Sequence, residues 1–123
     1  MDSNAGGDES QHQAKLVSLV RTSELPVTFN RRELDQILRI YGFMVSAGEW
    51  RDYAIDHLMD RAVFSIFRRT SEVPMFRVEK NPRLARKQGL YSVIAASGLI
   101  LKRGHELDRV LKIFDKSLSV VRS

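Results

Sequence analysis

The sequence contains no cysteine, and this absence excludes disulfide bonds and thiolate-bound metals. No apolar run approaches the roughly 20 residues that a membrane-spanning helix needs. The N-terminus, MDSNAGGDES, is acidic and polar, whereas a signal peptide begins with basic residues followed by apolar ones. Glycine-rich phosphate-binding motifs, such as Gly-x-Gly-x-x-Gly or the Walker pattern, do not occur either. These absences predict a soluble, cytoplasmic protein without a bound cofactor.

The sequence also lacks a recognisable catalytic arrangement. Its three histidines, at positions 12, 57 and 105, belong to no Ser-His-acid or Cys-His pattern. A cluster of acids around one histidine suggests oxygen and imidazole ligands for a divalent metal, but it has neither a calcium-loop pattern nor a His-x-x-x-His pair. The cluster consists of Glu49, Asp52, Asp56, His57 and Asp60. We interpret it as solvated charges and turn formers, and we expect neither an enzyme nor a metal site.

Length and composition indicate one globular domain with a tail. The chain has 123 residues, of which 43% are hydrophobic and 28% charged, as in ordinary soluble domains. Residues 1–24 are predicted to form a flexible acidic and polar tail, and residues 25–123 the folded domain. Within the tail, the segment AKLVSLV at 14–20 is too short to be a stable helix alone. It is either a docking segment or simply the end of the tail.

The predicted fold is organised around residues 52–80. This stretch contains three runs rich in β-branched and aromatic residues, separated by turn residues, which is typical of an antiparallel meander. The runs cover residues 53–58, 62–69 and 75–80. Residues 49–60 also fit a helix, because three aspartates recur there at intervals of four. The short Met-Asp-Arg link to the next run favours a hairpin instead.

An edge strand and a capped helix are predicted before the meander. Residues 25–29 favour an edge strand, since their proline cannot donate a ladder hydrogen bond. Asn30 and Glu33 have the spacing of a capping box, and Gly48 marks the end of the helix. Gly42 is expected to allow close approach of the helix backbone to the sheet. The predicted apolar stripe consists of Leu34, Ile37, Leu38, Tyr41, Met44 and Val45.

A second hairpin and a final helix are predicted after the meander. The turn signal at 81–83 is followed by a basic segment at 84–89. Residues 90–96 and 99–102 then form two short strands joined at a Ser-Gly turn. A helix begins at position 105 or 106, and its predicted core stripe is Leu107, Val110, Leu111, Phe114, Leu118 and Val121.

These elements predict an α+β domain. Its antiparallel sheet, a meander plus a hairpin, packs against two amphipathic helices that cover one face. The opposite face then carries residues such as Ser65 and Arg77, and it is available to a partner.

Basic residues gather in one part of the sequence. Residues 68–112 contain 11 Lys and Arg against 4 Asp and Glu, a net charge of +7, whereas the whole chain carries +5. If the five basic residues at 83, 86, 87, 102 and 103 converge, they can neutralise several phosphates of a nucleic acid, DNA or RNA. The alternative is a solvated basic surface, because no aromatic RNA-binding strand signature and no helix-turn-helix is present. The candidate nucleic-acid-binding residues are Arg68, Arg69, Arg77, Lys80, Arg83, Arg86, Lys87, Lys102 and Arg103.

The single tryptophan allows two interpretations. Trp50 follows the helix end and lies beside Arg51 and Tyr53, so it is a candidate anchor for a partner or a platform for a base. A lone tryptophan at such a corner more often closes the end of a core, and we favour that structural interpretation.

Two blocks of the sequence are distinctive, GEWRDYAIDHLMDRAVFSIFRR and RKQGLYSVIAASGLILKRGHELDRVLKIFD. They resemble a family of small bacterial proteins catalogued only as a domain of unknown function, and the resemblance extends over about residues 29–115. It implies a small bacterial cytoplasmic protein, and it transfers no functional residue.

Three functional hypotheses follow. The first is a non-enzymatic module that binds nucleic acid or a ribonucleoprotein through its basic surface. The second is a protein-interaction or regulatory module that receives a partner, or another copy of itself, on the open sheet face or on the edge at 25–29. The third, an enzyme that uses the aspartates near His57, is the weakest.

Overall fold

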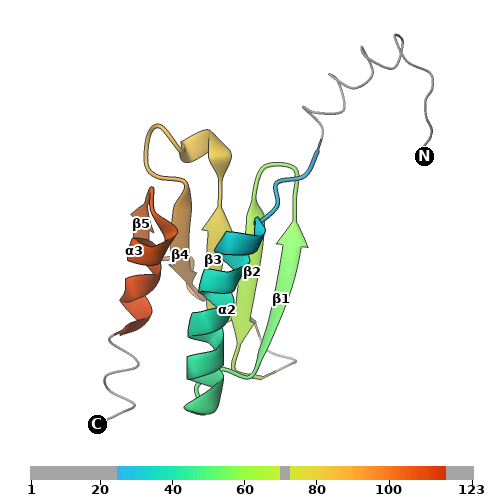
Figure 1. Ribbon diagram of the computed structural model, residues 1–123, viewed down its shortest axis with the longest axis vertical. Helices are drawn as coiled ribbons and strands as arrows, with labels where there is room; N and C mark the ends of the chain where they lie inside the picture. The colour runs from blue at the N-terminus through green and yellow to red at the C-terminus, as the bar shows by residue number, and fades with distance from the viewer. Residues whose placement is uncertain (1–24, 70–72, 116–123) are drawn as a thin grey trace, which may run out of the picture.

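The computed structural model describes residues 25–69 and 73–115 (Figure 1). The strands form one sheet in the order β1-β2-β3-β4-β5, and every neighbouring pair is antiparallel. The predicted α+β class is therefore confirmed. The predicted tail, the segment at 14–20 and the last two stripe residues, Leu118 and Val121, lie outside the described residues. In chain order the elements are α2 (Arg31–Ser46), β1 (Asp52–His57), β2 (Ala62–Phe67), β3 (Phe76–Lys80), the 3₁₀ turn η1 (Pro82–Leu84), β4 (Tyr91–Ala95), β5 (Ile100–Gly104), α3 (Leu107–Leu111) and the 3₁₀ turn η2 (Lys112–Phe114).

The two predicted hairpins are present. Residues 52–57 form a strand rather than a helix, with Ile55 opposite Phe64 and His57 opposite Ala62. The second hairpin turns at Gly98, whose φ of 93° is readily adopted by glycine. Its ladder shifts register between Val93 and Ile94, which is the irregularity of a β-bulge.

The predicted capping box of α2 is confirmed. The Asn30 side chain accepts a hydrogen bond from the Glu33 backbone N–H at 2.8 Å, and Glu33 Oε1 accepts one from the Asn30 backbone N–H at 2.7 Å. These two bonds satisfy N–H groups that the first turn of a helix leaves unpaired. Asn30 therefore fixes where α2 begins.

The predicted apolar stripe of α2 is correct along its centre and wrong at one side. Ile37 and Met44 are buried, but Leu38 and Val45 are 37% and 40% exposed. Ile40, which was not predicted, packs against the core, because the helix is rotated about its axis toward α3. Gly42 was expected to approach the sheet, and this is wrong, because a Cβ added there would meet nothing within 4 Å.

Residues 25–29 do not form the predicted edge strand. Their backbone makes one backbone–backbone hydrogen bond to the sheet region, from Val27 N–H to the Leu58 carbonyl at 2.8 Å. Pro26 cannot extend a ladder, and the segment instead crosses toward the start of α2, where Phe29 enters the core at 5% exposure. The outer strands of the sheet are therefore β1 and β5.

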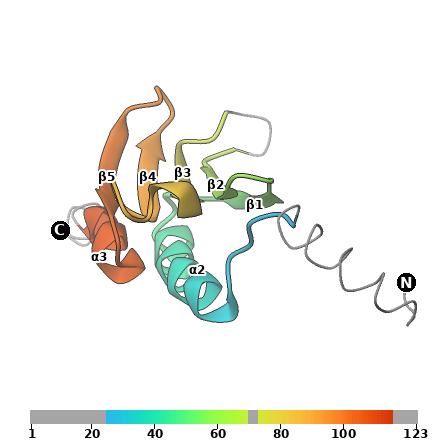
Figure 2. The same ribbon diagram turned by 90° about the horizontal axis from the view of Figure 1, so that it is seen from above.

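Both helices lie on one face of the sheet (Figure 2). The core between the layers joins Phe64, Val78 and Val93 from the sheet to Ile37 of α2 and Val110 of α3. No described element covers the opposite face, which we call the open face. Ser65 and Arg77 are paired across β2 and β3 on that face, as the alternation of side chains along a strand requires.

Candidate functional site

The basic connector, residues 81–89, joins β3 to β4 at one end of the sheet (Figure 1). Asn81 holds its start, because its backbone N–H donates to the Leu90 carbonyl at 2.8 Å and its side chain accepts from Arg83 N–H at 3.1 Å. The Leu84 carbonyl then accepts from the N–H groups of residues 87, 88 and 89. The connector is consequently a hydrogen-bonded turn structure rather than an extended loop.

Gly89 fixes the far end of the basic connector against the end of β5. Its φ is 115°, in the region that side-chain-bearing residues rarely adopt. A Cβ at this position would lie 2.7 Å from the carbonyl carbon and oxygen of Gly104. Only glycine therefore permits this close approach of the two backbones.

Three basic side chains are exposed on this fixed backbone. Arg83, Arg86 and Lys87 all face solvent, and the nine residues of the connector include no acid. Among the residues that the structure describes, none of the three lies within ion-pair distance of a carboxylate. The connector thus concentrates three positive charges without local compensation.

Arg103 lies beside the basic connector. Its guanidinium donates to Gln88 Oε1, and its Nε donates to Ser92 Oγ at 3.3 Å. Ser92 and Arg103 are opposite each other on β4 and β5, on the open face. Lys102 is next to Arg103 on β5 and therefore lies on the other side of the sheet, since neighbouring strand residues alternate. Of these two residues, Arg103 alone extends the positive charge of the connector across the open face.

The other candidate basic residues lie apart from the connector. Arg68 and Arg69 follow β2 at the opposite end of the sheet (Figure 1), and Arg68 lies 3.4 Å from Glu49. Arg77 is on the open face, with its Nε 3.5 Å from Glu79. The predicted set of nine residues is therefore not one patch.

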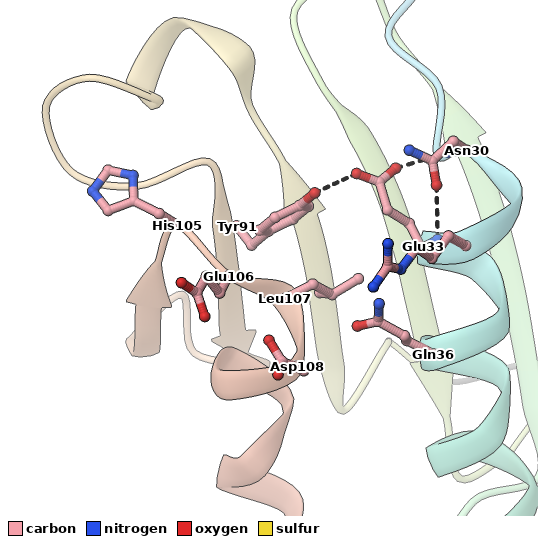
Figure 3. Close-up of a pocket in the computed structure, with 9 residues that line it drawn as sticks. Asn30, Glu33, Gln36, Tyr91, His105, Glu106, Leu107 and Asp108 are labelled. Carbon is pink, nitrogen blue, oxygen red and sulfur yellow. Dashed lines mark hydrogen bonds between the residues drawn. The ribbon is translucent and has the colours of Figure 1, made fainter.

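Lys80 is used inside the molecule. Its ammonium group donates to Glu33 Oε1 and to the Thr28 carbonyl, both at 2.9 Å. The Glu33 carboxylate also accepts a hydrogen bond from the Tyr91 hydroxyl, as Figure 3 shows. This network joins the start of α2 to the ends of β3 and β4, so Lys80 has a structural role.

The network sets the ionisation of its members. Burial by itself raises the pKa of the Glu33 carboxyl, but hydrogen bonds from Tyr91, Lys80 and the Asn30 backbone outweigh burial and hold that pKa below its ordinary value. Burial, with the hydrogen bond to Glu33, raises the pKa of Tyr91 far above its ordinary value. Glu33 is therefore charged and Tyr91 neutral near pH 7.

A cavity of about 590 Å³ lies between the first turns of α2 and α3 (Figure 3). Its lining mixes charges of both signs, which favours no single ligand class. Glu33 and Tyr91 were not recognised as site residues from the sequence. The capping box predicts the contact of Glu33 with Asn30, but not its contacts with residues far away in the sequence. The lining residues are Asn30, Arg32, Glu33, Gln36, Tyr91, His105, Glu106, Leu107 and Asp108.

The acidic cluster around His57 is divided by the sheet. Asp52 and Asp56 lie on the open face of β1, and His57 lies on the helix side, since neighbouring strand residues alternate. Asp60 pairs with Arg61 at 3.0 Å. In residues 25–69 and 73–115, no group of three or more His, Asp or Glu side chains is close enough to hold a metal ion.

Trp50 closes the core rather than projecting from it. Its side chain is 3% exposed, and its ring packs edge-on against Phe114 with 4.9 Å between centroids. A partner therefore cannot reach the indole in this arrangement.

Within the described part of the chain, no helix combines the length and apolar character needed to cross a membrane.

The fold and this site define a small α+β protein with a helix-covered antiparallel sheet and a basic connector at one end. The chain belongs to a family described as proteins of unknown function (DUF2794), whose model matches residues 27–111. The matched range includes the first sequence block and nearly all of the second, so the resemblance is confirmed. No curated protein and no solved structure matches the chain.

Proposed function

We propose that the protein is a small cytoplasmic, non-enzymatic module of a bacterial cell that binds the phosphate backbone of nucleic acid through the basic connector. The observation that supports this proposal is the connector itself. Arg83, Arg86 and Lys87 are exposed on a hydrogen-bonded backbone, without an acidic neighbour in residues 81–89. Arg103 extends the positive charge along the adjoining open face.

Two physical effects make this connector suitable for phosphate. Arginine presents a planar fork of donors that matches phosphate oxygens in pairs. A backbone that is already ordered loses less conformational entropy when it binds. Phosphate contacts release condensed counterions, and binding through them is therefore strongly salt-dependent.

The proposed binding is independent of base sequence. Among the described residues, the connector carries no aromatic side chain on which a base could stack, and no helix extends from it into a groove. Phosphate contacts position a protein on nucleic acid but carry no sequence information. We expect similar affinities for unrelated sequences of equal length.

A binding titration with a matched control variant tests the proposal. Fluorescently labelled duplex and single strands of mixed sequence are titrated at low salt with the unmodified protein and with the triple variant R83Q/R86Q/K87Q. The control, R39Q/R109Q/K112Q, removes the same charge from α2, α3 and η2. We expect the connector variant to bind about tenfold more weakly or worse, because three phosphate contacts are lost, and the control to bind almost as the unmodified protein does.

Two results would contradict this function. Absent binding by the unmodified protein at low salt would leave the connector as a solvated surface. Equal weakening in both variants would show that total charge, and not the connector, governs binding. Circular dichroism of both variants checks that the fold is retained.

A second candidate function is protein interaction through the open face. No described element covers this face, although Val63, Ser65 and Ile94 on it are buried. Arg61 and Arg77 both lie within ion-pair distance of Glu79, whose side chain is also on this face. A partner that binds here would have to contact Arg77 and Arg103. The variant R77E/R103E tests this candidate. We expect a protein that co-purifies with the unmodified chain to be lost from the variant, and unchanged co-purification would contradict this function.

A further inference from the structure

The two outer strands of the sheet differ in how they resist pairing with another chain. Outer strands expose unpaired backbone groups, and proteins protect them with bulges, positive charges or proline. β5 has such protection, since its ladder is shifted at Val93 and Ile94 and it carries Lys102 and Arg103. β1 has six residues in continuous register with β2 and contains no lysine, arginine, proline or glycine.

The outward backbone groups of β1 can be identified from its hydrogen bonds. In an antiparallel pair, alternate residues direct both N–H and C=O toward the neighbouring strand. Leu58 N–H donates to the Arg61 carbonyl at 2.8 Å, which places the even-numbered residues of β1 toward β2. Tyr53, Ile55 and His57 then direct their backbone groups outward, and the Tyr53 N–H accordingly bonds to the Asp52 side chain at 2.8 Å.

The helix side of β1 is also incompletely covered. Figure 2 shows α3 along β4 and β5 and α2 along β2 and β3, with β1 beyond α2. Tyr53 is 41% exposed, whereas Ile66 opposite it on β2 is fully buried. Among the described residues, β1 is thus the strand with both its outer edge and its inner face least protected.

We propose that β1 pairs with β1 of a second copy of this chain, antiparallel and about a two-fold axis at Ile55. This arrangement places Ile55 opposite Ile55, and Tyr53 opposite His57 of the second copy. All three outward-facing residues then exchange backbone hydrogen bonds, about six in total across the pair. The two sheets merge into one, and both helix layers stay on the same side, because residues that face each other share a face.

Charge selects this register over its nearest alternative. With the axis at Ile55, Asp56 on the open face lies opposite Ala54 of the second copy. With the axis at Ala54, Asp56 would lie opposite Asp52 of the second copy, and like charges directly opposite each other destabilise a strand pair. Of these two arrangements, the first opposes no carboxylates, and in it the edge complements itself. A second copy therefore suits it as the occupant.

Cysteine crosslinking tests the pairing, and the absence of native cysteine makes the result unambiguous. Directly opposed residues that exchange hydrogen bonds have Cα atoms about 5.5 Å apart, within the range of a disulfide. We expect I55C to form a covalent dimer under mild oxidation at least about ten times faster than A54C on the same strand or I100C on β5, because only position 55 meets itself. Position 100 serves as a control on the other outer strand, where Ile100 is 42% exposed and therefore accessible to the oxidant.

Mixed variants test the register. Y53C and H57C should crosslink to each other when mixed and should not crosslink alone. Faster dimer formation by A54C than by I55C, or crosslinking at all positions alike, would overturn the proposed arrangement. The variant R83Q/R86Q/K87Q combined with I55C should crosslink as fast as I55C, so failure of the nucleic-acid proposal and failure of this one are distinguishable.

Sedimentation equilibrium of the unmodified chain provides the second measurement. We expect a concentration-dependent dimer that is lost in I55P, because proline removes an outward N–H while leaving the bonds to β2 in place. Circular dichroism confirms that I55P remains folded. A strictly monomeric unmodified chain at high concentration would overturn the proposal.

Discussion

β1 and β5 are the two outer strands of one sheet, but they present opposite surfaces. The β5 side carries positive charge, a register shift and the basic connector fixed against Gly104. The β1 side carries Asp52 and Asp56 on its open face, no basic residue within the strand, and a regular ladder. This difference is the basis of the two proposals, polyanion binding at the connector end and self-pairing at β1, where carboxylates would repel phosphate.

The largest loss of stability is expected from a glycine substitution on the β5 side. There Gly89 packs directly against the backbone of Gly104 at the end of β5, and among the described residues β1 makes no such glycine contact. G89A should lower the free energy of unfolding by more than about 2 kcal/mol, because a positive φ and a clash with Gly104 act together. G98A also has a positive φ but meets no atom within 4 Å, so its loss should be about 1 kcal/mol. Urea unfolding measures both values, and equal losses would show that the Gly104 contact contributes nothing.

The Glu33 network anchors β3 and β4 to α2, and within residues 25–69 and 73–115 no comparable network of ion pairs and hydrogen bonds joins β1 to α2. E33Q keeps the shape of the side chain but leaves the half-buried Lys80 without its carboxylate, which should lower the free energy of unfolding by about 2 kcal/mol near pH 7. The folded-state pKa of Glu33 lies below its ordinary 4.5, so the stability it adds is present above that value and is lost as the pH falls through the lower folded-state value. Urea unfolding is therefore measured from pH 7 to pH 3. The difference in free energy of unfolding between the unmodified protein and E33Q should become smaller in acid. A difference that stays constant would contradict the charged state of Glu33.

A matched pair of exposed residues compares the two outer strands directly. Tyr53 on β1 and Ile100 on β5 are 41% and 42% exposed. Tyr53 also stacks on Phe64 at 4.9 Å between ring centroids and meets Tyr41 edge-on, and such aromatic pairs contribute about 1 kcal/mol each beyond burial. Y53A should therefore destabilise the monomer by about 1–2 kcal/mol and I100A by less than about 1 kcal/mol, as measured by thermal unfolding at low protein concentration. The reverse order would remove the structural role assigned to Tyr53.

The smallest effect is expected from the charges of β5. K102Q removes an exposed ammonium group that has no carboxylate partner among the described residues, and its free energy of unfolding should change by no more than about 0.5 kcal/mol. Sedimentation should also show unchanged self-association, since the register shift still protects β5. Increased association by K102Q would show that charge alone keeps β5 from pairing.

Local signals predicted most of the fold. The Asn30–Glu33 spacing located the start of α2, and short apolar runs separated by turn residues located both hairpins, because capping and tight turns depend on neighbours in the sequence. The rotation of α2 was not predictable in this way. Whether Leu38 or Ile40 is buried depends on where α3 packs, and the edge strand at 25–29 failed because that segment must lead Phe29 into the core.

The site was less predictable than the fold. Glu33 was recognised as a cap, but its bonds to Lys80 and Tyr91 span 47 and 58 residues and arise only when β3 and β4 are in place. The count of charged residues identified 68–112 as a basic region, but it did not show where these side chains lie in the fold. The meander then separates Arg68 from the connector by the length of a strand, so a charged segment of sequence becomes two distant groups in space.

The most direct test of the connector's assigned role is the salt dependence of nucleic-acid binding. The affinity of the unmodified protein, R83Q/R86Q/K87Q and R39Q/R109Q/K112Q for a labelled strand is measured at several salt concentrations. If three connector side chains contact phosphates, the slope of log K against log salt should be shallower in the connector variant by about 2 for single strands and about 3 for duplex, with little change in the control. Identical slopes for all three proteins would contradict the assignment of phosphate binding to the connector.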